Sequence, residues 1–314
     1  MVDWNSIWRK NNNIIWGWLA LLLILGAVLI SQLILPAKPT TPPAASTPVP
    51  PTQMPTQVSS KDGMMLLNIP AGNFLMGSSD ADISNYLKLF SGSLRSWFTD
   101  EQPQHTVYLD AFWIDQTDVT NAQYAKCVAA KFCRAPANIS SGRRNAYYGN
   151  SGFADYPMVN VDWNMAKAYC EWAGRKLPTE AEWEKAARGT DGRIFPWGSE
   201  VDCNKANYRD CVGDTSRVGS YPAGASPYGA LDMAGNVSEW VADWYDSAYY
   251  WFNNAYSGIR TSSNPTGPDY GQSKVLRGGN WDYFSDGMRT ASRADNDPTF
   301  AESDIGFRCA VSQP

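Results

Sequence analysis

Apolar residues near the start of the chain form one uninterrupted stretch, and the pattern changes sharply after it. Residues 14–35 carry no charged side chain. This stretch is long enough for an α-helix to cross a hydrocarbon core of roughly 30 Å. Trp16 and Trp18 stand near one end, where amphipathic rings favour the membrane interface. A cleaved signal peptide is the alternative, but its apolar region usually spans about 7–15 residues before a small-residue site. The pattern therefore predicts an uncleaved transmembrane helix over residues 14–35.

The residues on either side of this stretch predict its orientation and a linker after it. Arg9 and Lys10 precede it and Lys38 comes after it, so the positive-inside rule favours a cytoplasmic segment over residues 1–13. Residues 36–60 combine Pro with Thr, Ala, Ser and Gln and cannot bury enough surface to offset their ordering entropy. We expect an extended linker there, rising at most about 3.1 Å per residue. A globular domain over residues 64–314 would then lie outside the cell membrane.

Regular structure in the globular part is predicted to be sparse. Three helices are each opened by a capping side chain: residues 121–129 after Thr120, residues 163–173 after Asp162 and residues 180–189 after Thr179. Residues 107–109 and 274–277 have the composition of short strands. The remainder is rich in Gly, Pro, Asn, Asp and Trp, which predicts a loop-rich α+β domain.

Composition excludes some classes of function. The net charge is −5 and no basic cluster is present, so nucleic acid is not an expected partner. His105 is the single histidine, and no motif offers it a Ser or Cys nucleophile to activate, so we expect it to bond locally at a strand entry. Trp is abundant, and Trp172, Trp183, Trp197 and Trp240 are expected to fill the core rather than bind ligands.

Short motifs in a fixed order carry a resemblance to a known family. They are residues 69–72 (IPAG), 103–107 (PQHTV), 118–121 (DVTN), 157–163 (PMVNVDW), 168–174 (AYCEWAG), 176–184 (KLPTEAEWE), 196–198 (PWG), 232–240 (DMAGNVSEW), 276–279 (LRGG) and 306–309 (GFRC). In order and spacing they are similar to those of the formylglycine-generating enzyme (sulfatase-modifying factor) family. The resemblance covers about four-fifths of the chain and implies that family's fold, which is related to the C-type-lectin-like fold.

One departure from the family pattern bears directly on function. In the family, a Gly-Gly-Ser near the C-terminus is followed by two cysteines five residues apart, whose thiolates bind Cu(I) and oxidise a substrate cysteine. Here Gly278 and Gly279 are followed by Tyr283 and Met288 at the two cysteine positions. A soft-metal redox site needs soft thiolate ligands. Copper is therefore not expected, and neither is oxidase activity.

The resemblance also implies bound calcium, which takes carboxylate and carbonyl oxygens. One family position corresponds to the side chains of Asp232 and Glu239 with the carbonyls of Gly235 and Val237. The alternative is that Asn236 and Glu239 only satisfy backbone donors in a buried turn. A second position, in a loop shorter than that of eukaryotic members, corresponds to Asn207, the Tyr208 carbonyl, Asp210 and the Val212 carbonyl.

The six cysteines, beside a single histidine, favour disulfides over a zinc cluster. Cys170 and Cys309 match a family disulfide that joins the central helix to the C-terminus. The other cysteines fall into two pairs that are close in sequence: Cys127 with Cys133, and Cys203 with Cys211. Three bridges would imply an oxidising exterior, whereas the alternative is six reduced thiols in a cytosolic domain.

Two loops are expected to face the family's active-site groove, at residues 282–287 and 299–303. The candidate ligand contacts are Trp281, Asp282, Tyr283, Phe284 and Asp286. Three functions are compatible with these features: a membrane-anchored extracytoplasmic binding or accessory module for a peptide, glycan or protein, a structural subunit of a membrane complex, or an oxidase acting on a sulfatase cysteine. Fold does not fix function, and the missing cysteine pair favours the first.

Overall fold

The computed structural model describes residues 55–209, 211–251 and 261–313. The chain divides into residues 1–52 and 53–314, and the predicted helix at residues 14–35 lies outside the described residues, as does most of the predicted linker. Within the described ranges, no helix is both long and apolar enough to span a bilayer. The linker prediction extends too far, because residues 56–58 form a strand that pairs with residues 65–67. The pairing partner is outside the segment, so the composition of residues 36–60 alone could not predict it.

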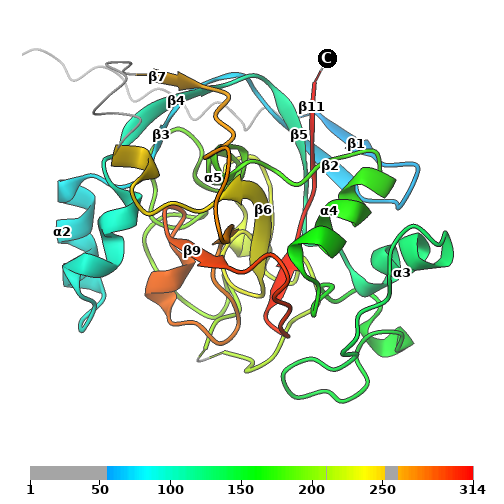
Figure 1. Ribbon diagram of the computed structural model, residues 1–314. Helices are drawn as coiled ribbons and strands as arrows, with labels where there is room; N and C mark the ends of the chain where they lie inside the picture. The colour runs from blue at the N-terminus through cyan, green and yellow to red at the C-terminus, as the bar shows by residue number, and fades with distance from the viewer. Residues whose placement is uncertain (1–54, 210, 252–260, 314) are drawn as a thin grey trace, which may run out of the picture. The chain divides into compact units, whose positions relative to one another are not determined.

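The strands form three small sheets (Figure 1). The first contains β1 (Thr56–Val58), β2 (Met65–Ile69), β5 (Phe112–Asp115) and β11 (Ala310–Ser312). The second contains β10 (Ile305–Phe307), β6 (Ser238–Trp244), β8 (Lys274–Arg277) and β9 (Arg293–Asn296). The third contains β3 (Gly72–Met76), β4 (His105–Leu109) and β7 (Thr261–Ser263). Most pairings are antiparallel, while β10 with β6 and β4 with β7 are parallel.

The predicted helices are confirmed together with their caps. They are α3 (Asn121–Ala129), capped by Thr120, α4 (Trp163–Trp172), capped by Asp162, and α5 (Glu180–Arg188), capped by Thr179. A further helix, α2 (Asp80–Leu89), was not predicted, and it begins at a capping box formed by Ser79 and Asp82. Short 3₁₀ helices are η1 (Arg95–Glu101), η2 (Ser151–Phe153), η3 (Pro222–Gly224) and η4 (Ser285–Met288). Figure 1 shows α2 on one side of the central strands and α3 and α4 on the other.

The helix α5 runs through the middle of the domain, and every residue of it is buried. Trp183 of α5 and Trp240 of β6 are fully buried, which confirms their predicted core role. Two carboxylates of α5 pair with arginines: Glu184 Oε2 lies 2.5 Å from Arg277 Nη2, and Glu180 Oε1 lies 2.7 Å from Arg293 Nε. Since breaking one partner of such a pair leaves a buried charge, these contacts fix where β8 and β9, and the loop between them, sit against α5.

Candidate functional site

The loop between β8 and β9 carries the two positions where the family's thiolates are expected. Gly278 and Gly279 turn the chain with φ of +93° and +66°, and a Cβ on Gly279 would come within 2.8 Å of the Gly287 carbonyl. This close approach fixes the loop ends. Met288 is 0% exposed and packs in a small apolar cluster, whereas Tyr283 is 44% exposed at the rim. The two positions thus hold a buried thioether and a surface phenol.

All six cysteines form disulfides, which confirms the three predicted bridges. Cys127 pairs with Cys133, Cys170 with Cys309 and Cys203 with Cys211. Because the sequence contains six cysteines in total, no thiol remains in the chain to ligate copper or to act as a nucleophile.

Two adjoining hollows of about 420 and 400 Å³ lie beside this loop. They share three lining residues, Trp97 of η1 with Phe284 and Asp286 of the loop. We call the two hollows together the aromatic groove. Its principal lining residues are Leu89, Phe90, Trp97, Arg209, Asp282, Tyr283, Phe284 and Asp286.

Three aromatic side chains of the groove face solvent. Trp97 is 56% exposed and Phe284 is 59% exposed, beside Tyr283. The Arg209 guanidinium lies 4.4 Å from the centroid of the Phe284 ring, and the Arg209 backbone N–H donates to the Tyr283 carbonyl at 3.1 Å. On the opposite side, Ser93 Oγ donates to Asp286 Oδ2 at 2.8 Å, so this contact joins the segment after α2 to the loop.

The structure brings four of the five predicted groove residues together: Asp282, Tyr283, Phe284 and Asp286. Trp281 lies outside this lining. Its indole Nε1 donates to the Ser303 carbonyl at 3.3 Å, and its ring packs on Gly142. The loop at residues 299–303 therefore supports Trp281 and contributes none of the groove's lining residues. Trp97, Leu89 and Arg209 complete the groove and were not predicted.

The first predicted calcium position forms part of a buried acidic cluster, which we define as Asp118, Asp232 and Glu239. Both Glu239 oxygens accept hydrogen bonds from Arg308, at 2.6 and 2.8 Å, and Trp183 Nε1 donates to Glu239 Oε2 at 2.9 Å. Asp232 Oδ2 accepts from the Gly219 N–H at 2.7 Å. Burial, and then the Glu239 carboxylate, raise the pKa of Asp118 well above its ordinary value, and burial raises the pKa of Asp232 to about 6.

With all three carboxyls ionised, the acidic cluster would carry more negative than positive charge. Arg308 is the one cation that contacts it among the described residues. Among the residues that the structure describes, Asp118 Oδ1 has no hydrogen-bond partner, which is unusual for a buried polar atom. No set of three or more acidic, His or Cys side chains in the described ranges can hold a metal ion alone. A calcium ion here would therefore depend on the Gly235 and Val237 carbonyls, and it would share Glu239 with Arg308 and Trp183, which already donate to both of its oxygens.

The second predicted calcium position is used differently. Asn207 is fully buried, its Nδ2 donates to the Asp214 carbonyl at 2.7 Å, and its Oδ1 accepts from the Val212 N–H at 3.3 Å. The Tyr208 carbonyl accepts from the Cys211 N–H at 2.9 Å. Asp210 lies outside the described residues. The Asn207 amide thus closes this turn by itself. Calcium at this position stays a prediction.

Comparison with known proteins gives the family. A family model described as "Sulfatase-modifying factor enzyme 1-like domain" matches residues 51–313. The chain belongs to this family. The formylglycine-generating enzyme of Streptomyces coelicolor is 32% identical, over 78% of this chain and 88% of that enzyme. The structure of PvdO from Pseudomonas aeruginosa has a TM-score of 0.65 and 26% identity, covering 83% of this chain and 99% of that one.

Other members of the sulfatase-modifying factor family have different names. "Serine/threonine-protein kinase pkn1" of Chlamydia caviae is 37% identical over 253 residues, which are 77% of this chain and 37% of the kinase. This chain thus spans little more than a third of that relative. "Inactive C-alpha-formylglycine-generating enzyme 2" of Mus musculus is 37% identical over 59% of this chain and 56% of that protein. Membership therefore does not decide the chemistry, which has to be argued from this chain's own residues.

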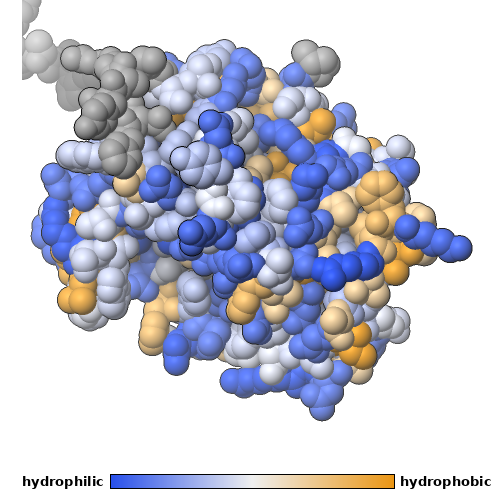
Figure 2. All heavy atoms as spheres, in the orientation of Figure 1, coloured by the Kyte–Doolittle hydropathy of each residue, from blue (hydrophilic) through white to orange (hydrophobic). Residues whose placement is uncertain are grey.

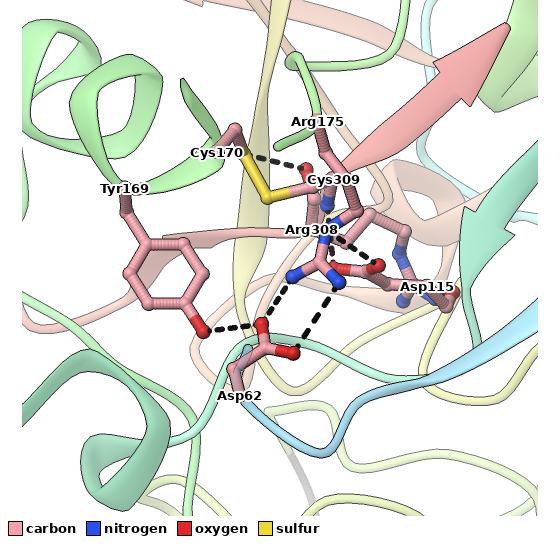
Figure 3. Close-up of a disulfide and its surroundings, with 7 residues drawn as sticks. All are labelled: Asp62, Asp115, Tyr169, Cys170, Arg175, Arg308 and Cys309. Atoms are coloured by element: carbon pink, nitrogen blue, oxygen red, sulfur yellow. Dashed lines mark hydrogen bonds and ion pairs between the residues drawn. A yellow bond between two sulfur atoms is a disulfide. The ribbon is translucent and has the colours of Figure 1, made fainter. Parts of the chain in front are cut away.

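Next to the Cys170–Cys309 disulfide, the domain holds a second buried charge network (Figure 3). Arg175 lies between two carboxylates: it pairs with Asp62, and its Nε lies 3.4 Å from Asp115 Oδ1. Asp115 Oδ2 accepts from the Cys309 N–H at 2.9 Å, and Tyr169 Oη donates to Asp62 Oδ2 at 2.8 Å. Burial raises the pKa of Asp115 to about 7.

Mild acid is expected to stabilise this domain through Asp115. The carboxyl has an ordinary pKa of 3.8 and a folded-state pKa of about 7, so the folded state holds more protons between these values and stability falls as pH rises across them. We expect the free energy of unfolding to be on the order of 1–2 kcal/mol lower at pH 8 than at pH 5. Melting curves across this range test it: Asp115→Asn should reduce the slope, with the remainder coming from Asp118 and Asp232, whose pKa values are also raised. The exposed-site control Asp269→Asn should keep the full slope. A flat wild-type profile would contradict the expectation.

Proposed function

We propose that this chain is an extracytoplasmic binding or accessory module, held at the cell membrane by residues 14–35, that uses the aromatic groove and does not oxidise cysteine. The observation that carries the proposal is the loop between β8 and β9. It presents Tyr283 and Phe284 to solvent while burying Met288, at the position where the family has a redox ligand. The loop therefore offers a contact surface in place of a metal site.

The absence of a thiol pair argues against oxidase chemistry on physical grounds. Cu(I) binding in this family depends on soft thiolates, and every cysteine of the chain is already oxidised in a disulfide. Met288 has a thioether sulfur but is 0% exposed within an apolar cluster. A substrate cysteine entering the groove would meet aromatic rings, two carboxylates and a guanidinium.

No formylglycine formation is expected from this domain. The test incubates the purified ectodomain with Cu(I), oxygen and a peptide that bears the family's Cys-x-Pro-x-Arg motif, and follows the mass change of thiol-to-aldehyde conversion. A formylglycine-generating enzyme serves as the positive control under the same conditions. Turnover above the enzyme-free background would refute the proposal, because the chain would then need a ligand set that its described residues do not offer.

The exposed aromatic rings favour a binding role. Side chains as large as Trp97 and Phe284 stabilise a fold chiefly when buried, and exposed apolar patches often mark interaction sites. On the face drawn in Figure 2, hydrophilic and intermediate side chains predominate, and hydrophobic ones gather in separate patches. The aromatic groove joins such side chains to Asp282, Asp286 and Arg209, a mixture that supplies both contact area and orientation.

A ligand of the groove is expected to lose affinity when Phe284 is truncated. Screening the ectodomain against peptide and glycan arrays would supply a ligand, and Phe284→Ala should weaken its binding about tenfold or more, which is about 1.4 kcal/mol. Tyr270→Ala is the matched control, because Tyr270 is 86% exposed and lies outside the lining of the groove. Equal affinities for wild type and Phe284→Ala would count against the groove and favour a structural-subunit role.

The proposed location rests on the disulfides and on the uncharged stretch near the start of the chain. Three disulfides persist in oxidising surroundings and are rare in the cytosol. The predicted membrane helix lies outside the described residues, so the anchor is argued from its uncharged sequence. Protease added to spheroplasts with an intact cytoplasmic membrane should remove the domain, whereas protection there would place the domain on the cytoplasmic side.

A further inference from the structure

The three disulfides differ in how far solvent can reach them. Cys170, Cys309, Cys127 and Cys133 are buried. Cys203 is exposed and Cys211 is half-buried. A thiol reductant must reach a sulfur atom to attack it, and exposed disulfides are the labile ones. Among these bridges, the Cys203–Cys211 disulfide is therefore the one that an external dithiol can reduce while the fold stays intact.

This accessible disulfide closes the loop that forms one wall of the aromatic groove. The two cysteines are 8 positions apart, and Arg209 lies between them in sequence. The first half of the loop is anchored independently, because the Asn236 N–H donates to the Asn207 carbonyl at 2.7 Å and Asn207 Nδ2 donates to the Asp214 carbonyl at 2.7 Å. Release of the disulfide would therefore act mainly on the residues after Asn207.

Arg209 depends on this loop for its position. Its backbone N–H donates to the Tyr283 carbonyl, and its guanidinium stacks on Phe284. Among the described residues, no carboxylate forms an ion pair with Arg209. Stacking on an exposed ring contributes only about 0.5–1 kcal/mol, which is too little to hold a long side chain by itself. The Cys203–Cys211 bridge adds a covalent constraint to the hydrogen bond between the Arg209 N–H and the Tyr283 carbonyl.

We propose that the Cys203–Cys211 disulfide is a redox-sensitive clamp that shapes the aromatic groove by holding Arg209 against Tyr283 and Phe284. An extracytoplasmic dithiol would supply two electrons and two protons: the S–S bond breaks, two thiols form on the protein, and the reductant leaves as its own disulfide. The reduced loop is free to withdraw Arg209, and the groove loses that wall. The inference rests on the proposed function for its biological meaning and on the geometry alone for the clamp.

The first experiment measures selective reduction. The ectodomain is titrated with dithiothreitol, quenched with an alkylating reagent and mapped by mass spectrometry, with circular dichroism recorded at each step. Cys203 and Cys211 should be alkylated at concentrations that leave the other four cysteines oxidised and the spectrum unchanged. Simultaneous reduction of all three bridges, or earlier reduction of Cys127–Cys133, would overturn the clamp.

The second experiment measures the groove itself by hydrogen–deuterium exchange. In the Cys203→Ser/Cys211→Ser variant, amides of residues 208, 209, 211 and 212 and of residues 281–287 should exchange about tenfold faster or more, since the lost constraint releases the loop. Cys127→Ser/Cys133→Ser is the matched control: its loop is also short, with a separation of 6, and it should leave both segments unchanged. Unchanged exchange in the first variant, or equal changes in both, would overturn the clamp.

The exchange measurement needs no ligand, so the two proposals fail separately. Faster exchange at residues 281–287 with no Phe284-dependent ligand on the arrays would leave the clamp standing and refute the proposed function. A Phe284-dependent ligand whose affinity is the same before and after selective reduction would keep the binding function and refute the clamp's control of it. Agreement of both, with several-fold weaker binding after reduction, is the expected result.

Discussion

Replacing Cys170 and Cys309 together by alanine is expected to lower the free energy of unfolding by about 4–5 kcal/mol, because the disulfide closes a very long loop of the unfolded chain. The two residues are 139 positions apart and both are fully buried. The bridge also joins α4 to the segment before β11, where the Cys309 N–H donates to Asp115. Chemical denaturation followed by Trp fluorescence measures the change.

The matched control for this prediction is the Cys127→Ala/Cys133→Ala variant. Its loop spans only 6 positions, so the same entropy argument gives a loss of about 2–3 kcal/mol. The larger loss should therefore come from the long loop. If the two double variants lose equal stability, chain entropy is not the main term and local packing around each bridge decides the outcome.

Local sequence signals predicted the elements that local physics controls. The capping side chains Thr120, Asp162 and Thr179 fix where α3, α4 and α5 begin, and all three starts were predicted because a cap acts within one turn. The Ser79 and Asp82 box gives the same signal for α2 and was overlooked. Where pairing is long-range, the sequence gives less: β1 lies in a segment whose composition predicts an extended linker, and its partner β2 decides its structure.

The candidate site divides in the same way. Asp282, Tyr283, Phe284 and Asp286 were predicted because they follow the Gly278-Gly279 motif, at the place of the family's active-site groove. Trp97 and Arg209 are remote in sequence from that loop, and only the fold brings them to it. Trp281 is an aromatic residue of the type that binds ligands, yet its ring packs against Gly142, which has no side chain in the way. No local pattern distinguishes these outcomes.

The acidic cluster was predicted only in part, and its third carboxylate sharpens the calcium prediction. Asp118 lies in a family motif far from Asp232 and Glu239 in sequence, and it is fully buried beside them. Three carboxylates and one arginine leave surplus negative charge in a site without solvent, which is costly unless a proton or a cation compensates it. We propose that calcium compensates it, with ligands from Asp232, Glu239 and the Gly235 and Val237 carbonyls.

Substitutions at Glu239 and at Asp118 test the calcium proposal with different clarity. Glu239→Ala would leave Arg308 buried without its partner and cost about 3–5 kcal/mol whether or not calcium binds. Asp118→Asn gives the cleaner result, because the two explanations predict opposite signs. Without a cation, removing a surplus charge should raise the melting temperature. With calcium bound, the same change weakens the electrostatic attraction that holds the ion, so the melting temperature should fall.

Chelation is accordingly expected to lower the melting temperature of the wild-type ectodomain. An ion that binds only the folded state stabilises it by about 2.7 kcal/mol at a hundredfold excess over its dissociation constant, and removing the ion should remove that stabilisation. Asp232→Ala should melt at the same temperature with and without chelator, because a ligand is lost. Asp155→Asn, a change of an exposed carboxylate, should keep the full chelator response. Coincident wild-type curves with and without chelator, a melting temperature raised by Asp118→Asn, and no calcium in the purified protein by elemental analysis would together show that protons, not calcium, neutralise the cluster.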